Sequence, residues 1–101
     1  MSRLQQCRDA YDELLLEMVA AHMRQIDPRS ARGAPVLVGD LRRALHRMFP
    51  DKEEFDAAFV RLERTNRLIL VRHDAAMAGD SGDTTTLIFD GSMHYCGVAL
   101  R

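Results

Sequence analysis

The amino-acid sequence predicts a small α+β domain in which three helices precede a small antiparallel sheet. Apolar residues recur at helical spacing in three segments of the first two thirds of the chain, and β-prone runs separated by turn residues follow. The chain has 101 residues, of which 47% are hydrophobic and 29% charged, which is typical of one globular domain. We therefore expect a single domain over residues 1–101.

The first and longest helix is predicted over residues 4–26. One stripe of its residues is expected to face the core, and it consists of Leu4, Cys7, Tyr11, Leu14, Leu15, Met18, His22 and Ile26. Asp27-Pro28 ends the helix, because the residue before a proline is disfavoured in the α conformation. The turn-forming residues 28–35 predict a loop, and residues 36–38 predict a short β run.

Two shorter helices are predicted over residues 40–48 and 52–66. Asp51 and Glu54 have the spacing of a capping box at the start of the third helix, and Asn66 is suited to a left-handed stop. The apolar face of the third helix is expected to be buried, and it consists of Phe55, Ala58, Phe59 and Leu62.

Residues 68–100 are predicted to form a hairpin or small sheet. An uncharged run, Leu68–Val71, predicts one strand, and residues 74–84 predict a long tip rich in Gly, Asp and Ala. Thr85–Phe89 and residues 95–100 predict two more strands around an Asp90-Gly91 turn. The pattern leaves open which of these two pairs with the first strand.

Residues 36–73 resemble the middle of small bacterial winged-helix proteins. The resemblance lies in a β residue leading into DLRRAL, a capped DKEEFDAA helix that ends in RLERTNR, and the apolar run LILV. It implies a winged-helix transcription regulator of the cytoplasm, dimeric, with double-stranded DNA as partner. In that family the third helix commonly lies in the major groove.

The resemblance implies phosphate contacts from the arginines of the second and third helices. These candidate DNA-binding residues are Arg42, Arg43, Arg47, Arg61, Arg64 and Arg67. Arg29 and Arg32 in the preceding loop could extend the same positive patch. The alternative is that basic residues at a helix C-terminus complement the helix dipole, with Glu63 and Arg67 paired at i, i+4.

The charge distribution favours a second hypothesis, a protein-interaction module that has the same fold without binding DNA. The formal net charge is −1, whereas DNA-binding domains usually carry a basic excess. The expected outward face of the third helix begins with acidic residues, and it consists of Glu53, Asp56, Ala57, Val60, Arg64 and Arg67. The predicted tip at residues 74–84 carries three aspartates and no Lys or Arg.

An interface for a second copy or another protein is predicted on the first helix. Leu16, Val19 and Met23 widen its apolar face beyond what a small core needs. The alternative is that these residues pack inside the domain.

No enzyme, cofactor or small-molecule substrate is predicted. Cys7 and Cys96 are expected to be free thiols, and His22 a satisfied core histidine. His73, His94 and Cys96 share strands, but no known zinc-ligand spacing is present, so no metal is expected. No apolar run long enough to span a membrane and no secretory signal is found, which predicts a cytoplasmic protein.

Overall fold

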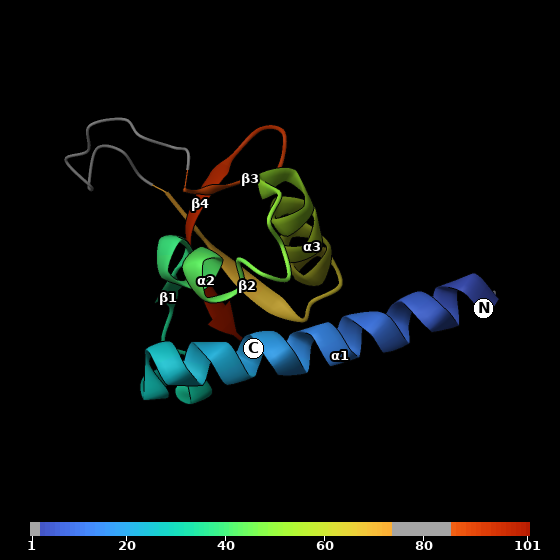
Figure 1. Ribbon diagram of the computed structural model, residues 1–101, viewed down its shortest axis with the longest axis horizontal. Helices are drawn as coiled ribbons and strands as arrows, with labels where there is room; N and C mark the ends of the chain where they lie inside the picture. The colour runs from blue at the N-terminus through green and yellow to red at the C-terminus, as the bar shows by residue number, and fades with distance from the viewer. Residues whose placement is uncertain (1–2, 74–85) are drawn as a thin grey trace.

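The computed structural model describes residues 3–73 and 86–101, with side chains from Cys7 onward. Its elements in chain order are α1 (Arg3–Ile26), the 3₁₀ helix η1 (Pro28–Arg32), β1 (Val36–Leu37), α2 (Val38–Ala44), α3 (Lys52–Arg64), β2 (Leu68–Arg72), β3 (Ile88–Phe89) and β4 (His94–Leu100). The described chain is a small α+β domain with three α-helices and a four-stranded antiparallel sheet, as predicted (Figure 1). The predicted tip at 74–84, and Thr85, lie outside the described residues.

Local signals place most helix ends. The Asp51 side chain accepts a hydrogen bond from the backbone N–H of Glu53 at 3.1 Å, which confirms it as the N-cap of α3. Asn66 is left-handed, with φ of 62°, just after the helix, as predicted. Asp27 accepts from the N–H of Arg29 at 2.9 Å and starts η1, so the predicted loop contains a helical turn.

The predicted range of the second helix, 40–48, is wrong at both ends. α2 begins at Val38, directly after the two residues of β1, and ends at Ala44. Val38 and Leu41 are buried, so the start of α2 is fixed by packing rather than by the Gly39-Asp40 pair. Residues 45–48 continue as turns, in which the N–H of Met48 donates to the carbonyl of Leu45 at 3.0 Å.

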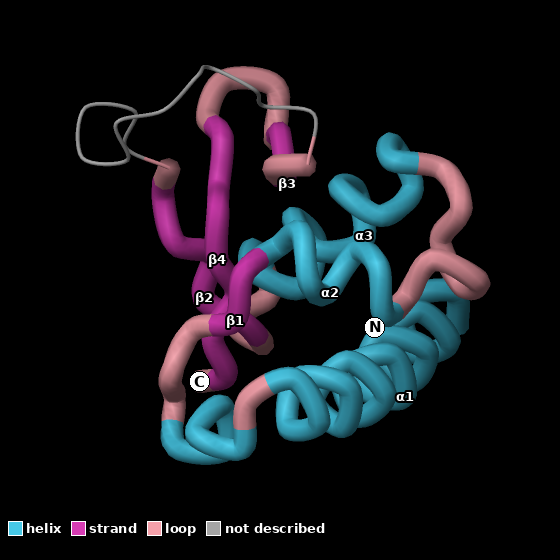
Figure 2. The backbone as a smooth tube through the Cα atoms, turned by 60° about the vertical axis from the view of Figure 1, so that its left-hand side comes forward, coloured by secondary structure: helices cyan, strands magenta, loops and turns pink. Residues whose placement is uncertain are grey.

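The sheet is built around β4, which settles the strand pairing that the sequence left open. β2 pairs with one edge of β4, with Leu70 opposite Val98, and β1 and β3 pair with its other edge. Figure 2 shows the helices on one side of these strands. Val98 and Leu68 are fully buried and join the core formed with the helices.

The aromatic residues of α3 form the centre of the core. Phe55 and Phe59 are both fully buried, and their rings stack with centroids 4.4 Å apart. Phe49 packs edge-on against Phe55, with a centroid distance of 6.0 Å. The burial of Phe55, Ala58, Phe59 and Leu62 confirms the predicted inner face of α3.

The predicted core stripe of α1 is wrong at four of the seven members whose side chains the structure describes, and Leu4 lies outside them. Val19 and Met23 are fully buried and Leu15 nearly so, whereas Tyr11, Leu14 and Met18 are 54%, 63% and 43% exposed. Cys7 is exposed as well. Successive residues are about 100° apart around a helix, so α1 is apolar over about half of its circumference, and the domain covers only part of that arc.

His22 lies at the edge of the covered part of α1. It is half-buried, and its Nδ1 lies 2.8 Å from the carbonyl oxygen of Met18 within the same helix. The histidine is thus satisfied, as predicted, but it is not a fully buried core residue.

Asp90 organises the turn between β3 and β4. Its carboxylate accepts hydrogen bonds from the N–H groups of Ser92 and Met93, at 2.9 and 2.7 Å, and from the Tyr95 hydroxyl at 2.8 Å. These donors, the Met93 N–H first among them, hold the pKa of Asp90 well below its ordinary value of 3.8. The hydrogen bond from the Tyr95 hydroxyl to Asp90 raises the pKa of Tyr95.

We expect Asp90→Ala to loosen this turn, because three donors lose their acceptor. Amide hydrogen exchange at Ser92 and Met93 should become faster while the α3 amides stay protected. In the unmutated protein the lowered pKa stabilises the fold above about pH 4, and this contribution is lost as the pH falls through the folded-state pKa. An Asp90 carboxyl that titrates by NMR near 3.8 would contradict the assignment.

None of the described helices is both long enough and apolar enough to cross a membrane.

Candidate interaction surface

Arg42, predicted to contact DNA, is instead half-buried inside the domain. Its Nη2 donates to Asp56 Oδ1 at 3.0 Å, and Nε and Nη2 donate to the carbonyl of Thr86 at 3.2 and 3.1 Å. The guanidinium lies over the Phe55 ring, 4.3 Å from its centroid. Arg42 therefore joins α2, α3 and the segment before β3, and its positive charge is paired with Asp56 inside the domain.

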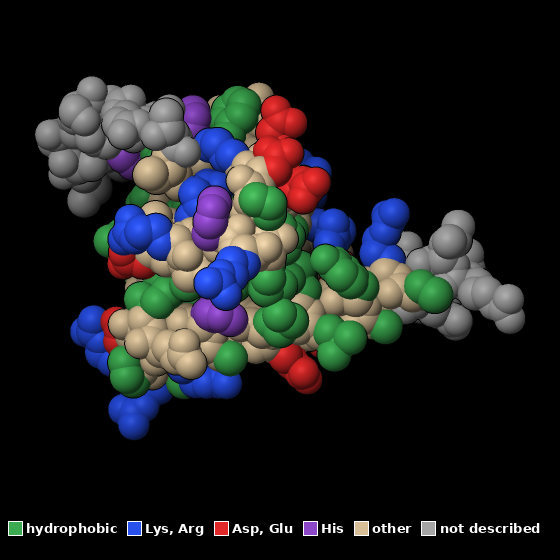
Figure 3. Space-filling view, in the orientation of Figure 1, with side chains coloured by type: hydrophobic (Ala, Val, Ile, Leu, Met, Phe, Trp, Pro, Cys, Tyr) green, Lys and Arg blue, Asp and Glu red, His purple; other side chains and the backbone are tan. Residues whose placement is uncertain are grey.

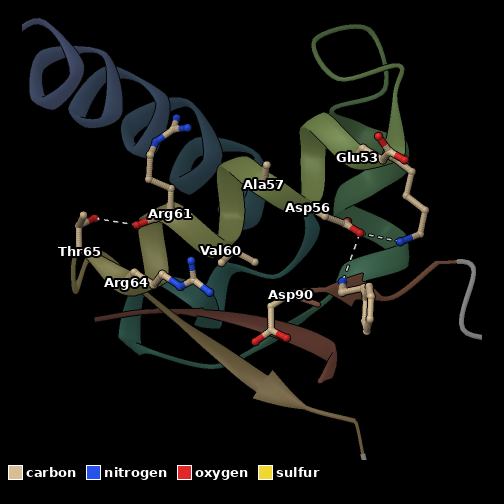
Figure 4. A pocket seen from close by; sticks show the side chains of 10 residues that line it. Glu53, Asp56, Ala57, Val60, Arg61, Arg64, Thr65 and Asp90 are labelled. Atoms are coloured by element: carbon tan, nitrogen blue, oxygen red, sulfur yellow. Dashed lines mark hydrogen bonds and ion pairs between the residues drawn. The ribbon is translucent and has the colours of Figure 1, made fainter. Parts of the chain in front are cut away.

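Asp56, predicted to face outward, is the other half of this arrangement. It is 6% exposed, and besides Arg42 it accepts from Lys52 Nζ at 2.5 Å and from the N–H of Phe89 at 3.2 Å. Figure 4 shows the Asp56 carboxylate turned towards these donors. Val60, also expected outside, is 8% exposed. The outward face predicted for α3 is thus wrong at two positions, because β3 packs along it.

Two further arginines of the predicted patch hold α1 against α3 and the start of β2. Arg61 binds the buried carboxylate of Asp12, with Nε 3.0 Å from Oδ1. Arg67 donates to Glu13 at 3.0 Å and lies 3.8 Å from Asp9. The expected helical pair of Arg67 with Glu63 is therefore not formed, because α3 ends at Arg64.

The other three arginines predicted to contact DNA, Arg43, Arg47 and Arg64, are exposed. Arg43 forms an ion pair with Asp40, three residues earlier in α2. Arg47 and Arg64 are exposed, and no ion pair with another described residue is found for either. The six arginines thus do not act as one free positive patch. Four of them are paired with carboxylates.

A groove of about 600 Å³ runs between α3 and the β3–β4 turn (Figure 4). Its lining combines an apolar strip with charges of both signs, and includes Ala57, Phe89, Arg64, Glu53 and Asp90. Three basic and three acidic residues line this groove, so it has no positive excess for a phosphate backbone; they are Lys52, Arg61, Arg64, Glu53, Asp56 and Asp90.

The predicted interface residues of α1 lie in or against the core. Val19 and Met23 are fully buried, and Leu16 is half-buried and packs against the core cluster. For Val19 and Met23 the predicted partner contact is therefore wrong, and the alternative interpretation, that they pack inside the domain, holds. For Leu16, which is partly exposed, the partner contact stays a prediction. Asp12, which pairs with Arg61, lies on this same side of α1.

The exposed apolar surface of α1 lies on the neighbouring side of the helix. This α1 stripe consists of Cys7, Tyr11, Leu14 and Met18, which are separated by four, three and four residues. Such 4–3–4 spacing is the seam of a helix that packs on another helix. Figure 1 shows the N-terminal turns of α1 projecting beyond α3, and Figure 3 shows hydrophobic side chains along this projecting part.

A second exposed apolar surface lies on the sheet. Leu37, Ile69 and Val71 are 63%, 41% and 36% exposed. Leu37 and Val71 both pair with Gly97, and Ile69 pairs with Ala99, so these side chains share one face of the sheet. A Cβ at Gly97 would lie 3.3 Å from the Val71 Cβ, so glycine keeps this face flat.

The histidines and cysteines of the strands do not assemble a metal site. The N–H of His73 donates to the carbonyl of His94 at 2.9 Å, and Cys96 Sγ lies 3.6 Å from the carbonyl of Arg72. In the part of the chain that the structure describes, no three His, Cys, Asp or Glu side chains are grouped so as to hold an ion.

Comparison of this chain with protein families, with curated proteins and with solved structures finds no match.

Proposed function

We propose that this protein is a protein-interaction module that self-associates through the α1 stripe. The observation that carries the proposal is the exposure of Tyr11, Leu14 and Met18 at coiled-coil spacing on a helix that projects from the domain. The internal pairing of Arg42, Arg61 and Arg67 supports it, because those charges are not free for phosphates.

The scaffold that we propose is a winged helix. Support comes from the order of its elements, a helix, a short strand, two helices and then strands paired around β4, together with the resemblance of residues 36–73. On this scaffold the helix outside the α2–α3 pair is the one that carries the association surface.

Sedimentation equilibrium tests the self-association. We expect the wild-type chain to form dimers, and Leu14→Asp to weaken dimerisation at least tenfold, because a carboxylate would be buried in each half of a two-fold interface. Leu37→Asp is the matched control, since Leu37 is also 63% exposed but lies on the sheet. Dimers that resist Leu14→Asp and dissociate with Leu37→Asp would assign the association to the sheet.

DNA binding is the second candidate, favoured by the exposed Arg47 and Arg64. Under the proposed function we expect no detectable binding of a random duplex by fluorescence anisotropy even at low salt, because four of the six arginines predicted to contact DNA are paired with carboxylates. Binding that falls steeply with salt and is lost in the Arg47→Glu, Arg64→Glu double variant would favour the DNA-binding interpretation instead.

A further inference from the structure

We infer that the outward side of α3 is a second self-association surface, on which α3 of another copy packs antiparallel. This α3 face consists of exposed residues along one side of the helix and its C-cap, and they are Glu53, Glu54, Ala57, Arg64 and Thr65. The inference goes beyond the proposed function, because the face lies on a different helix from the α1 stripe. It is carried by the opposite charges at the two ends of the face and by the small residue between them.

The α3 face is acidic at its start and basic at its end. Glu53 and Arg64 are exposed, and neither forms an ion pair with another residue in the described part of the chain. Their separation in the sequence is just over three helical turns, so both lie on the same side of α3, about 16 Å apart along its axis. Both line the groove between α3 and the β3–β4 turn (Figure 4).

The other charged side chains of this groove already have partners within the fold. Lys52 binds Asp56, Arg61 binds Asp12, and Asp90 accepts the hydrogen bonds of its turn. The charges at the two ends of the α3 face are therefore the ones in the groove that remain for a partner.

An antiparallel pair of α3 helices brings these opposite charges together. A two-fold axis at the middle of the face places Glu53 opposite Arg64 of the second copy, and Arg64 opposite Glu53 of the second copy. Side chains on the same edge of two antiparallel helices meet, and these two residues share an edge. A parallel pair would instead place each charge beside the same charge of the second copy, where the two repel. The charges thus favour the antiparallel orientation.

The middle of the α3 face allows the two helices to approach closely. Ala57 is exposed and lies between the two charges, and Val60 follows three residues later with 8% exposure. In the antiparallel pair Ala57 of each copy lies beside Val60 of the other, so no large side chain separates the helices. Phe89, 43% exposed, adds apolar surface across the groove. An apolar centre with charges towards its ends is the usual arrangement of a specific interface.

Charge reversal in a Leu14→Asp background tests this pair, because that variant disables the α1 stripe. Sedimentation equilibrium at up to about 1 mM protein should show dimers of this chain. Glu53→Arg and Arg64→Glu should each weaken dimerisation by about tenfold or more, because each places like charges together at both ends of the interface. The double variant restores opposite charges at both ends, and its dimerisation should return to within about threefold of the background.

Two other charge reversals are the matched controls. Glu17→Arg and Arg47→Glu make the same changes of charge at exposed residues outside α3. Neither should change dimerisation by more than about twofold, because exposed charges far from the interface are screened by salt. Thermal unfolding followed by circular dichroism verifies that each variant is folded.

The outcomes separate this inference from the proposed function. A Leu14→Asp chain that stays monomeric throughout overturns the α3 pair and leaves the proposed function intact. Single reversals at Glu53 and Arg64 that act no more strongly than the controls, or a double variant that does not recover, also overturn the α3 pair. Wild-type dimers that resist Leu14→Asp, weaken with Glu53→Arg and recover in the double variant would support the α3 pair and overturn the proposed function.

Discussion

Met23→Asp is expected to prevent folding. Met23 is fully buried on the side of α1 that faces the core, and a carboxylate there would have neither water nor a cation. The cost should exceed about 4 kcal/mol, which is a large part of the roughly 5–15 kcal/mol that stabilises a domain. Circular dichroism should show no cooperative thermal transition. Met23→Ala, which leaves a cavity, should fold with a loss of about 2–5 kcal/mol.

Leu14→Asp is the informative comparison for Met23→Asp, since both variants replace an apolar residue of the same helix with an aspartate. Leu14 is 63% exposed, so we expect the stability of the folded monomer to change by about 0.5 kcal/mol or less. The measurement is made at a concentration that dissociates dimers, because self-association raises apparent stability. A well-folded Met23→Asp protein that had merely become monomeric would show that Met23 belongs to an interface.

These two residues illustrate where sequence reasoning about α1 fails. Leu15, Val19 and Met23 form one stripe at helical spacing, and Tyr11, Leu14 and Met18 form another beside it on the same broad apolar arc. Periodicity identifies the arc but does not say which half the domain covers. The 4–3–4 spacing of the exposed half was the available signal that two stripes were present.

The elements with local determinants were predicted well. Asp51 caps α3 through a hydrogen bond to a residue two positions away, and Asp90-Gly91 forms its turn within a few residues. Such features depend on chain segments short enough to be read directly. The predicted start of α2 was wrong: the Gly39-Asp40 pair suggested a start at residue 40, whereas the helix begins at the buried Val38.

The internal pairing of the arginines could not be predicted from the sequence, because their partners are distant in the chain. Arg61 pairs with Asp12, 49 residues away, and Arg42 donates to the carbonyl of Thr86, 44 residues away. In the sequence, arginines clustered on two helices are consistent with a phosphate-binding patch. The fold places carboxylates beside most of them. The same contacts hold α1 against α3, and α2 against α3 and the segment before β3.

Asp56→Ala is expected to cause the largest loss among the charged residues. It would leave the Arg42 guanidinium, whose side chain is only 19% exposed, without a counter-charge and the Phe89 N–H without its acceptor. Breaking one side of a buried ion pair typically costs about 3–5 kcal/mol, because the remaining charge stays desolvated. Urea unfolding followed by circular dichroism measures this loss.

Lys52 provides the control for Asp56, because it contacts the same carboxylate from a more exposed position. Its side chain is 40% exposed and lies one helical turn before Asp56, so Lys52→Gln should cost less than about 1 kcal/mol. Replacing both partners, in Arg42→Met with Asp56→Leu, should recover most of the stability lost in Asp56→Ala, since no buried charge remains unpaired. If Asp56→Ala lowered stability no more than Lys52→Gln, the ion pair of Arg42 with Asp56 would not be desolvated in solution, and Arg42 would return to the residues that could contact phosphates.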